Sequence, residues 1–230
     1  MKLGRRRLLA GATTAAATST YVPFAAKAQV RPIRIGVLTD LSSRYRDLVG
    51  DMSVAAARQA IADFGSAGIA AVLVVADLQS RPDVALSVAR HGFGRDDVDA
   101  IVDVPSSSAA LAITTLARER NKVLLVTSAS TTELTGAQCS PNTVHWSYNT
   151  YMNAKSTGGA LTEAGGTSWF IIAADYAFGQ RVTADIKTIV AQKGGTSLNF
   201  AMFDRDAEAT HHARRGCAIG RGDGRQSSAA

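Results

Sequence analysis

The sequence is poor in cysteine: its 230 residues include only Cys139 and Cys217. Two cysteines do not form a disulfide framework, and no group of cysteines and histidines has the spacing of a metal site. No Gly-x-Ser-x-Gly motif is present, and no Gly-x-Gly-x-x-Gly follows an expected strand. The sequence therefore predicts no metal, no dinucleotide cofactor and no enzymatic activity. An exported hydrolase is the weakest of the alternatives kept open.

An excess of one charge is missing from the middle of the chain. The net charge is +6, yet residues 29–203 contain 15 basic and 15 acidic side chains. The excess comes from the two ends: residues 1–28 contain five basic side chains and no acidic one, and residues 204–230 are also basic overall. A neutral middle gives no electrostatic footprint for nucleic acid, so we predict no nucleic-acid partner.

Residues 1–28 have the features of a secretory signal peptide. A basic cluster, Arg5-Arg6-Arg7, precedes an uncharged stretch rich in alanine and threonine, and Ala26-Lys27-Ala28 resembles a cleavage site. The uncharged stretch is too short and too weakly apolar to be a good membrane span. We predict export to the periplasm, and the consecutive arginines suggest the twin-arginine route.

Apolar runs alternate with segments of helical periodicity from residue 33 onward. Strands are expected at 33–38, 70–77, 100–104, 122–126, 168–173 and 197–203, and helices at 52–64, 83–91, 151–164 and 180–193. A further helix is expected after Ser108, within the stretch 98–121. This alternation is typical of an α/β fold with a mostly parallel sheet that is covered on both faces. Residues 139–149 are expected to form an irregular connection at a domain boundary, with a first lobe at 29–146 and the start of a second at 147–203.

Hydroxyl-rich loops follow four of the expected strands, at 41–45, 105–108, 127–132 and 174–179. Ligands of parallel sheets bind beyond the carboxyl ends of the strands, so we expect these loops to gather at one edge and hold a polar molecule. Three serines, Ser106 to Ser108, precede a helix with Ala110, Ile113, Leu116 and Ala117 on one face. The N-terminus of that helix would suit a carboxylate. The alternative, a helix cap with solvated serines, stays open.

Four segments together carry a family resemblance: IRIGVLTDLSSRY, DVPSSSAALAI, VTSASTTELTGAQCSPNTVHW and ADYAFG, in that order after an export signal. Over residues 31–203 the chain resembles the periplasmic substrate-binding proteins of branched-chain amino-acid-type ABC importers, typified by the leucine/isoleucine/valine-binding protein. The resemblance implies a periplasmic binding protein type I-like fold, in which two α/β lobes close on a small ligand. It also implies that an amino acid or related carboxylate is delivered to an ABC permease in the inner membrane. A ligand-sensing receptor module of the same fold is the alternative.

The same resemblance assigns ligand-binding roles to nine residues in three groups. The first turn that holds the carboxylate corresponds to Val104, Pro105 and Ser106, and the second turn to Ala129, Ser130 and Thr131. The second lobe presents Tyr176, while Tyr45 and Tyr151 match positions where aromatic side chains line the pocket. The chain departs from the family at Ser43, where glycine is usual, and at the following Arg44, which bears on the size or charge of the ligand.

Residues 204–230 differ in character from the rest of the sequence. They show no apolar periodicity and contain a single bulky aliphatic residue, Ile219. Such a segment cannot bury enough apolar surface to fold, so we expect it to be disordered. Family members are considerably longer, and we interpret 204–230 as out-of-frame translation after a frameshift. A truncated protein is then expected to bind weakly or not at all; reading the other two frames of the encoding DNA tests this interpretation.

Overall fold

The computed structural model describes residues 31–65, 68 and 70–203. The predicted signal peptide and the interpreted tail at 204–230 lie outside these residues. The chain divides into the units Met1–Arg31 and Pro32–Ala230, and the description below concerns the second. Its elements are β1 (Ile33–Thr39), α1 (Gly50–Phe64), β2 (Ala71–Asp77), α2 (Pro82–Gly94), β3 (Ala100–Asp103), α3 (Ser107–Glu119), β4 (Val123–Val126), η2 (Thr132–Leu134), β5 (Thr143–His145), α4 (Thr150–Asn153), the π-helical turn η3 (Ala154–Gly159), α5 (Ala160–Glu163), β6 (Ser168–Ala174), α6 (Ala177–Gln192) and β7 (Thr196–Phe203).

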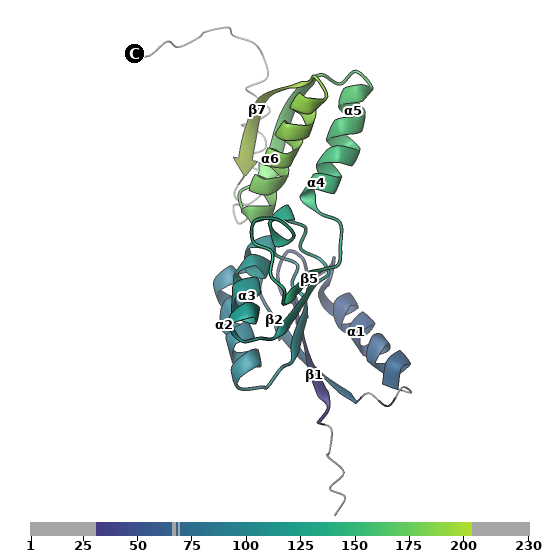
Figure 1. Ribbon diagram of the computed structural model, residues 1–230, viewed down its shortest axis with the longest axis vertical. Coiled ribbons are helices and arrows are strands. Elements are labelled where there is room, and N and C mark those ends of the chain that lie inside the picture. The colour runs from purple at the N-terminus through teal and green to yellow at the C-terminus, as the bar shows by residue number, and fades with distance from the viewer. Residues whose placement is uncertain (1–30, 66–67, 69, 204–230) are drawn as a thin grey trace, which may run out of the picture. The chain divides into compact units, whose positions relative to one another are not determined.

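Two parallel sheets organise these elements. The first has the strand order β2-β1-β3-β4-β5, and the second pairs β6 with β7. Helix α1 lies on one face of the first sheet, and α2 and α3 lie on the other (Figure 1). The predicted α/β class with a parallel sheet covered on both faces by helices is confirmed.

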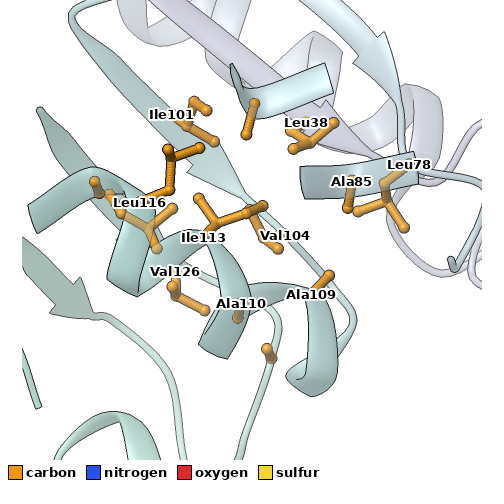
Figure 2. Packing of buried hydrophobic residues seen from close by; sticks show 14 of the residues in the cluster. Leu38, Leu78, Ala85, Ile101, Val104, Ala109, Ala110, Ile113, Leu116 and Val126 are labelled. Atoms are coloured by element: carbon orange, nitrogen blue, oxygen red, sulfur yellow. The ribbon is translucent and has the colours of Figure 1, made fainter. Parts of the chain in front are cut away.

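The main core lies between the first sheet and helices α2 and α3. Helix α3 buries the stripe that its sequence predicted, Ala110, Ile113, Leu116 and Ala117. Figure 2 shows Ile113 beside Val104, which comes directly after β3. Each fully buried aliphatic side chain contributes about 1.5–3 kcal/mol, so this stripe fixes the position of α3 and hence of its N-terminus.

One expectation for the first sheet is wrong. Residues 139–149 were expected to be irregular, but Thr143–His145 form β5 and pair in parallel with Leu124–Val126 of β4. So short a strand cannot show an alternating pattern, which explains why the sequence concealed it. The last strand of the first sheet therefore lies inside the predicted connection, just before the expected start of the second lobe at 147.

Two of the predicted helices differ clearly from their predicted bounds. Helix α6 begins at Ala177, so most of the loop expected at 174–179 is its N-cap and first turn. The helix expected at 151–164 is interrupted by η3, where Gly158 and Gly159 pack against α6 and lower the helix propensity.

Among residues 31–65, 68 and 70–203, the structure contains no helix with the length and apolar character needed to cross a membrane.

Candidate functional site

Three of the hydroxyl-rich loops leave neighbouring strand ends. In the parallel register, Leu38 of β1 lies beside Asp103 of β3, and Asp103 lies beside Val126 of β4. The chain therefore leaves all three strands at the same edge, as the sequence predicted for 41–45, 105–108 and 127–132. Strand β1 has β2 on one side and β3 on the other, which makes the gap between the β1 and β3 loops a topological switch point. In open α/β sheets this is where ligands bind.

The N-terminus of α3 lies at this edge, and the hydroxyl of its N-cap residue makes no hydrogen bond. Ser106 is the N-cap residue and is 0% exposed, yet its side chain makes no capping hydrogen bond. Among the described residues its Oγ has no hydrogen-bond partner at all. Ser107 is also buried, so the alternative of a helix cap with solvated serines does not describe Ser106 and Ser107. Because the first N–H groups of a helix lack intrahelical acceptors, this end offers donors at the positive end of the dipole.

The backbone just before this helix is in a strained conformation. Asp103 has φ 81° and Val104 has φ 57°, a left-handed region that β-branched residues rarely occupy. The Val104 N–H donates to the Leu38 carbonyl at 3.0 Å, which ties the turn to β1. The side chains of Val104 and Ala129 belong to the core, so only their backbones are available to a ligand. Strained backbone conformations of this kind, maintained by the surrounding structure, are concentrated at functional sites.

Most hydroxyls of the second turn have protein partners. Thr127 donates to Asp103 Oδ1 at 3.1 Å, and Ser128 donates to the same oxygen. Thr131 Oγ1 accepts a hydrogen bond from the Glu133 N–H at 3.4 Å, which caps η2. Ser130 is buried, and its Oγ lies 3.5 Å from the Ser128 carbonyl. The second turn is therefore held rigidly by its own side chains, and Ser130 keeps the weakest internal contact.

The three predicted tyrosines do not all come together. The hydroxyls of Tyr45, after β1, and Tyr176, after β6, share a hydrogen bond. Tyr151 is 46% exposed in α4, and no hydrogen bond joins it to the other predicted residues within the described part of the chain. The structure thus places Tyr45 and Tyr176 next to each other and leaves Tyr151 outside that pair.

Asp40, which the sequence interpretation missed, organises the loop that carries Tyr45. Its buried carboxylate accepts hydrogen bonds from the Ser43 N–H and hydroxyl, from the Tyr45 N–H at 2.9 Å, and from the Ser80 hydroxyl at 2.5 Å. Ser43 stands where the resemblance implies a glycine, and its hydroxyl donates to this carboxylate. The spacing Asp40-x-x-Ser43 after a strand is an Asx-turn signal that could have revealed the local half of the network.

The pKa of Asp40 is lowered despite its burial. Burial alone would raise it, but the hydrogen bonds from the Ser43 and Ser80 side chains and from the Tyr45 and Ser43 N–H groups stabilise the charged form and outweigh that effect. Because the pKa in the folded protein lies below the unfolded value, Asp40 stabilises the fold above about pH 4 and loses this contribution as the pH falls through its folded pKa.

We expect Asp40→Asn to lower the free energy of unfolding at pH 7 by about 2 kcal/mol, since charge-assisted hydrogen bonds are lost. Urea denaturation should show this difference shrinking as the pH falls below about 4, where the unfolded carboxyl becomes protonated and the folded one follows at lower pH. Asp47→Asn is the matched control, because Asp47 lies in the same loop with its side chain exposed. An Asp40→Asn deficit that stayed constant across this pH range would contradict the role given to the charge.

A second network that the sequence did not reveal joins the turn at 127–132 to α6. Asp185 is buried in α6 and accepts hydrogen bonds from Thr150 at 2.6 Å, Thr132 at 3.1 Å and Arg181 at 2.7 Å. Arg181 also pairs with Glu133 at 2.8 Å. The hydrogen bond with Asp185 is the largest of the effects that raise the pKa of Arg181, which keeps the guanidinium charged. These contacts hold the second turn against the helix that follows Tyr176.

The donors available to a ligand at this edge are neutral, and Asp103 Oδ2, which has no hydrogen-bond partner among the described residues, adds a carboxylate acceptor beside them. Hydroxyl groups and helix N–H groups can bind an anion or a polar group. The neighbouring His145 Nε2 contacts the Ala129 carbonyl at 2.8 Å and the Ser147 hydroxyl at 3.2 Å. Across residues 31–65, 68 and 70–203, no three or more His, Cys, Asp or Glu side chains form a group that could hold a metal ion.

Comparison with protein families gives a direct match. The periplasmic binding protein family model matches residues 32–210, beyond Phe203, where the sequence pattern had placed the end of the resemblance. The chain belongs to the periplasmic binding protein family. Family members are solute-binding proteins rather than enzymes, and the family implies a location outside the cytoplasm.

Solved structures of family members support this assignment. A periplasmic binding protein from Burkholderia mallei is 36% identical with a TM-score of 0.74, and the match covers 77% of this chain and 48% of that one. A branched-chain amino acid ABC transporter periplasmic ligand-binding protein from Burkholderia xenovorans is 35% identical, with a TM-score of 0.67 and coverage of 81% and 50%. A solute-binding protein from R. palustris in complex with benzoate shares the fold at 21% identity, with a TM-score of 0.75 and coverage of 82% and 53%.

The chain thus spans about half the length of these matched structures. Among curated protein sequences, none gives a significant match.

Proposed function

We propose that this chain is the ligand-capturing part of an extracytoplasmic solute-binding protein that takes up a small carboxylate for an ABC importer. The observation that carries the proposal is the buried Ser106 hydroxyl, which has no partner in the described structure and stands at the N-terminus of α3. A buried hydroxyl left without a hydrogen bond costs about 1–3 kcal/mol. A carboxylate placed there would accept hydrogen bonds from this hydroxyl and from the first N–H groups of the helix.

The other residues of the edge complete the proposed site. The backbones of Val104 and Pro105 form the first turn, and those of Ala129, Ser130 and Thr131 the second. Tyr45 and Tyr176, whose hydroxyls are already paired, would close over the ligand from two different loops. Tyr151, which is exposed, would contribute only if the ligand extended beyond this pair.

The class of ligand follows from the donors and from the matched structures. Neutral donors at a helix N-terminus favour an anion with two acceptor oxygens. One matched protein is described as the periplasmic ligand-binding protein of a branched-chain amino acid ABC transporter, and others were solved with benzoate or 4-hydroxybenzoate. We propose an amino acid or an aromatic acid, delivered to an ABC permease in the inner membrane after export by the twin-arginine route.

Titration of the 15N-labelled chain with benzoate, 4-hydroxybenzoate and leucine, followed by NMR, tests this proposal. We expect at least one carboxylate to give saturable shifts at the amides of Ser107, Ser108 and Ala109. The dissociation constant should be near about 1 mM rather than about 1 μM, because only half of a family member's length is present to contact the ligand.

Benzamide is the control ligand, since it keeps the ring and replaces the carboxylate with a neutral amide. It should leave the same amides unshifted. The proposal fails if no acid shifts these amides, or if benzamide shifts them as strongly as benzoate does.

A further inference from the structure

The turn between β2 and α2 contains two consecutive residues in the left-handed region. Gln79 has φ 54° and Ser80 has φ 50°, and the Arg81 N–H donates to the Leu78 carbonyl at 2.9 Å to close the turn. Residues other than glycine, asparagine and aspartate rarely adopt this conformation, because the Cβ atom crowds the backbone. Two such residues in succession store strain, which persists only because the surrounding structure maintains the turn.

Packing on both sides holds this turn in place. Leu78 is 0% exposed in the main core, and its N–H donates to the Thr39 carbonyl, at the end of β1, at 2.8 Å. Pro82 begins α2, and its ring favours the extended conformation that Arg81 adopts. The strand before the turn and the helix after it thus fix where Ser80 lies.

Ser80 reaches from this turn to the loop that carries Tyr45. It is 3% exposed, and its hydroxyl donates to Asp40 Oδ2 at 2.5 Å. The same oxygen accepts a hydrogen bond from the Tyr45 N–H at 2.9 Å. Glycine would fit the backbone of the turn at a lower cost, but it has no hydroxyl for this contact. The strain at position 80 therefore accompanies a hydrogen bond that only a side chain can make.

Asp77, the last residue of β2, connects the same turn to the start of the same loop. Its Oδ1 accepts hydrogen bonds from the Gln79 N–H at 2.9 Å and from the Leu41 N–H at 3.0 Å. Its Oδ2 accepts one from the Ser42 hydroxyl at 2.5 Å. Both ends of the loop after β1 are thus held from the end of β2, the strand that pairs with β1 in parallel.

We propose that Ser80 is a positioning residue of the ligand pocket, which fixes Tyr45 through Asp40 from the turn after β2. This role rests on the carboxylate-binding function proposed above. A loop that is already held in its bound conformation spares the ligand the cost of ordering it. Ser80 acts without touching the ligand, because its effect passes through Asp40 to the backbone of Tyr45, whose hydroxyl meets that of Tyr176.

Ser80→Ala and Ser80→Gly separate this role from a contribution to stability alone. Both remove the hydroxyl, but alanine keeps the backbone strain, whereas glycine relieves it. In urea, the midpoint of Ser80→Ala should fall by at least about 0.5 M, and that of Ser80→Gly should stay within about 0.3 M of the wild type. Both variants should nevertheless lose affinity about fivefold in the NMR titration, measured with whichever of benzoate, 4-hydroxybenzoate and leucine binds the wild type.

Hydrogen exchange at Tyr45 gives a second readout that needs no ligand. The Tyr45 amide should exchange at least about fivefold faster in both Ser80 variants than in the wild type, because its acceptor, Asp40, is held less firmly. Gln79→Gly is the matched control, since it relieves strain in the same turn and keeps the Ser80 hydroxyl. Its urea midpoint should rise by about 0.3 M, while its affinity and the exchange of Tyr45 stay unchanged.

Wild-type affinity in Ser80→Gly would overturn the proposal, because a lower affinity in Ser80→Ala alone would then follow stability. Unchanged exchange of the Tyr45 amide in both Ser80 variants would overturn it as well. A different result would reject the proposed function itself: none of the three acids would bind the wild type. Faster exchange at Tyr45 would in that case leave Ser80 with a structural role only.

Discussion

Replacing Gly179 with alanine should destabilise the second sheet by about 3 kcal/mol, through overpacking against backbone that cannot easily move. Gly179 is buried in the first turn of α6, and a Cβ atom there would lie 1.8 Å from the carbonyl oxygen of Ala174, at the end of β6. Relief requires α6 to move away from β6. The N-cap of α6 is Tyr176, so the same movement would separate its hydroxyl from that of Tyr45.

Urea denaturation followed by tryptophan fluorescence measures this effect. The chain has two tryptophans, and Trp146 is 74% exposed, so a Trp146→Phe background leaves Trp169 as the only reporter. Trp169 lies in β6, and its indole N–H donates to the Gly166 carbonyl at 2.7 Å. The signal therefore reports on the sheet that the substitution perturbs.

Gly65→Ala is the matched control for Gly179→Ala. Gly65 is the C-cap of α1, has right-handed helical dihedrals, and has nothing within 4 Å of the place where a Cβ would stand. The same chemical change should there be neutral or stabilising by about 0.5 kcal/mol, since the unfolded chain loses freedom. An equal change in the free energy of unfolding of both variants would show that the close approach of Gly179 to Ala174 does not destabilise Gly179→Ala.

Ser106→Asp should weaken carboxylate binding at least about tenfold while α3 still forms. Aspartate is among the best N-cap residues, so circular dichroism should show that α3 still forms, although a carboxylate at this fully buried position lowers the free energy of unfolding. Its negative charge would occupy the place proposed for the ligand's carboxylate and repel it. In the NMR titration with benzoate or 4-hydroxybenzoate, we expect affinity to fall at least about tenfold, which corresponds to about 1.4 kcal/mol.

The control for this change is Thr115→Asp, which adds the same charge to an exposed position on α3, two turns further along the helix. It should leave the titration unchanged, because the effect of a charge on the dipole falls off beyond the first turn. Wild-type affinity in Ser106→Asp would remove the N-terminus of α3 from the proposed site, whatever the stability of the variant.

Local periodicity explains which parts of the fold could be predicted. The apolar stripe of α3, from Ala110 to Ala117, follows from spacing alone, and the structure buries it as expected. The convergence of the loops after β1, β3 and β4 also follows, because parallel strands end at one edge. Strand β5 was not predicted, because three residues are too few to show an alternating apolar pattern. The segment becomes a strand by pairing with β4.

The direction of polar side chains could not be predicted in the same way. The sequence identifies Thr127 and Ser128 as hydroxyl donors, but their acceptor, Asp103, lies a helix and a strand earlier and is known only from the pairing of β3 with β4. Asp40 and Ser80 are even further apart in the sequence, and they meet through the pairing of β1 with β2. Which hydroxyls stay available to a ligand is thus decided by tertiary partners rather than by residue type.

The interior position of β1 has a consequence for the nascent chain. β1 pairs with β2 and β3, and Ile35 lies beside Ala100, which is synthesised only after α1, β2 and α2. Because translation adds about 5–20 residues per second, several seconds separate the two strands, and a two-stranded ribbon of β1 and β2 is marginal in the meantime. The segment that contains β1 therefore completes its pairing in the sheet only after β3 has been synthesised.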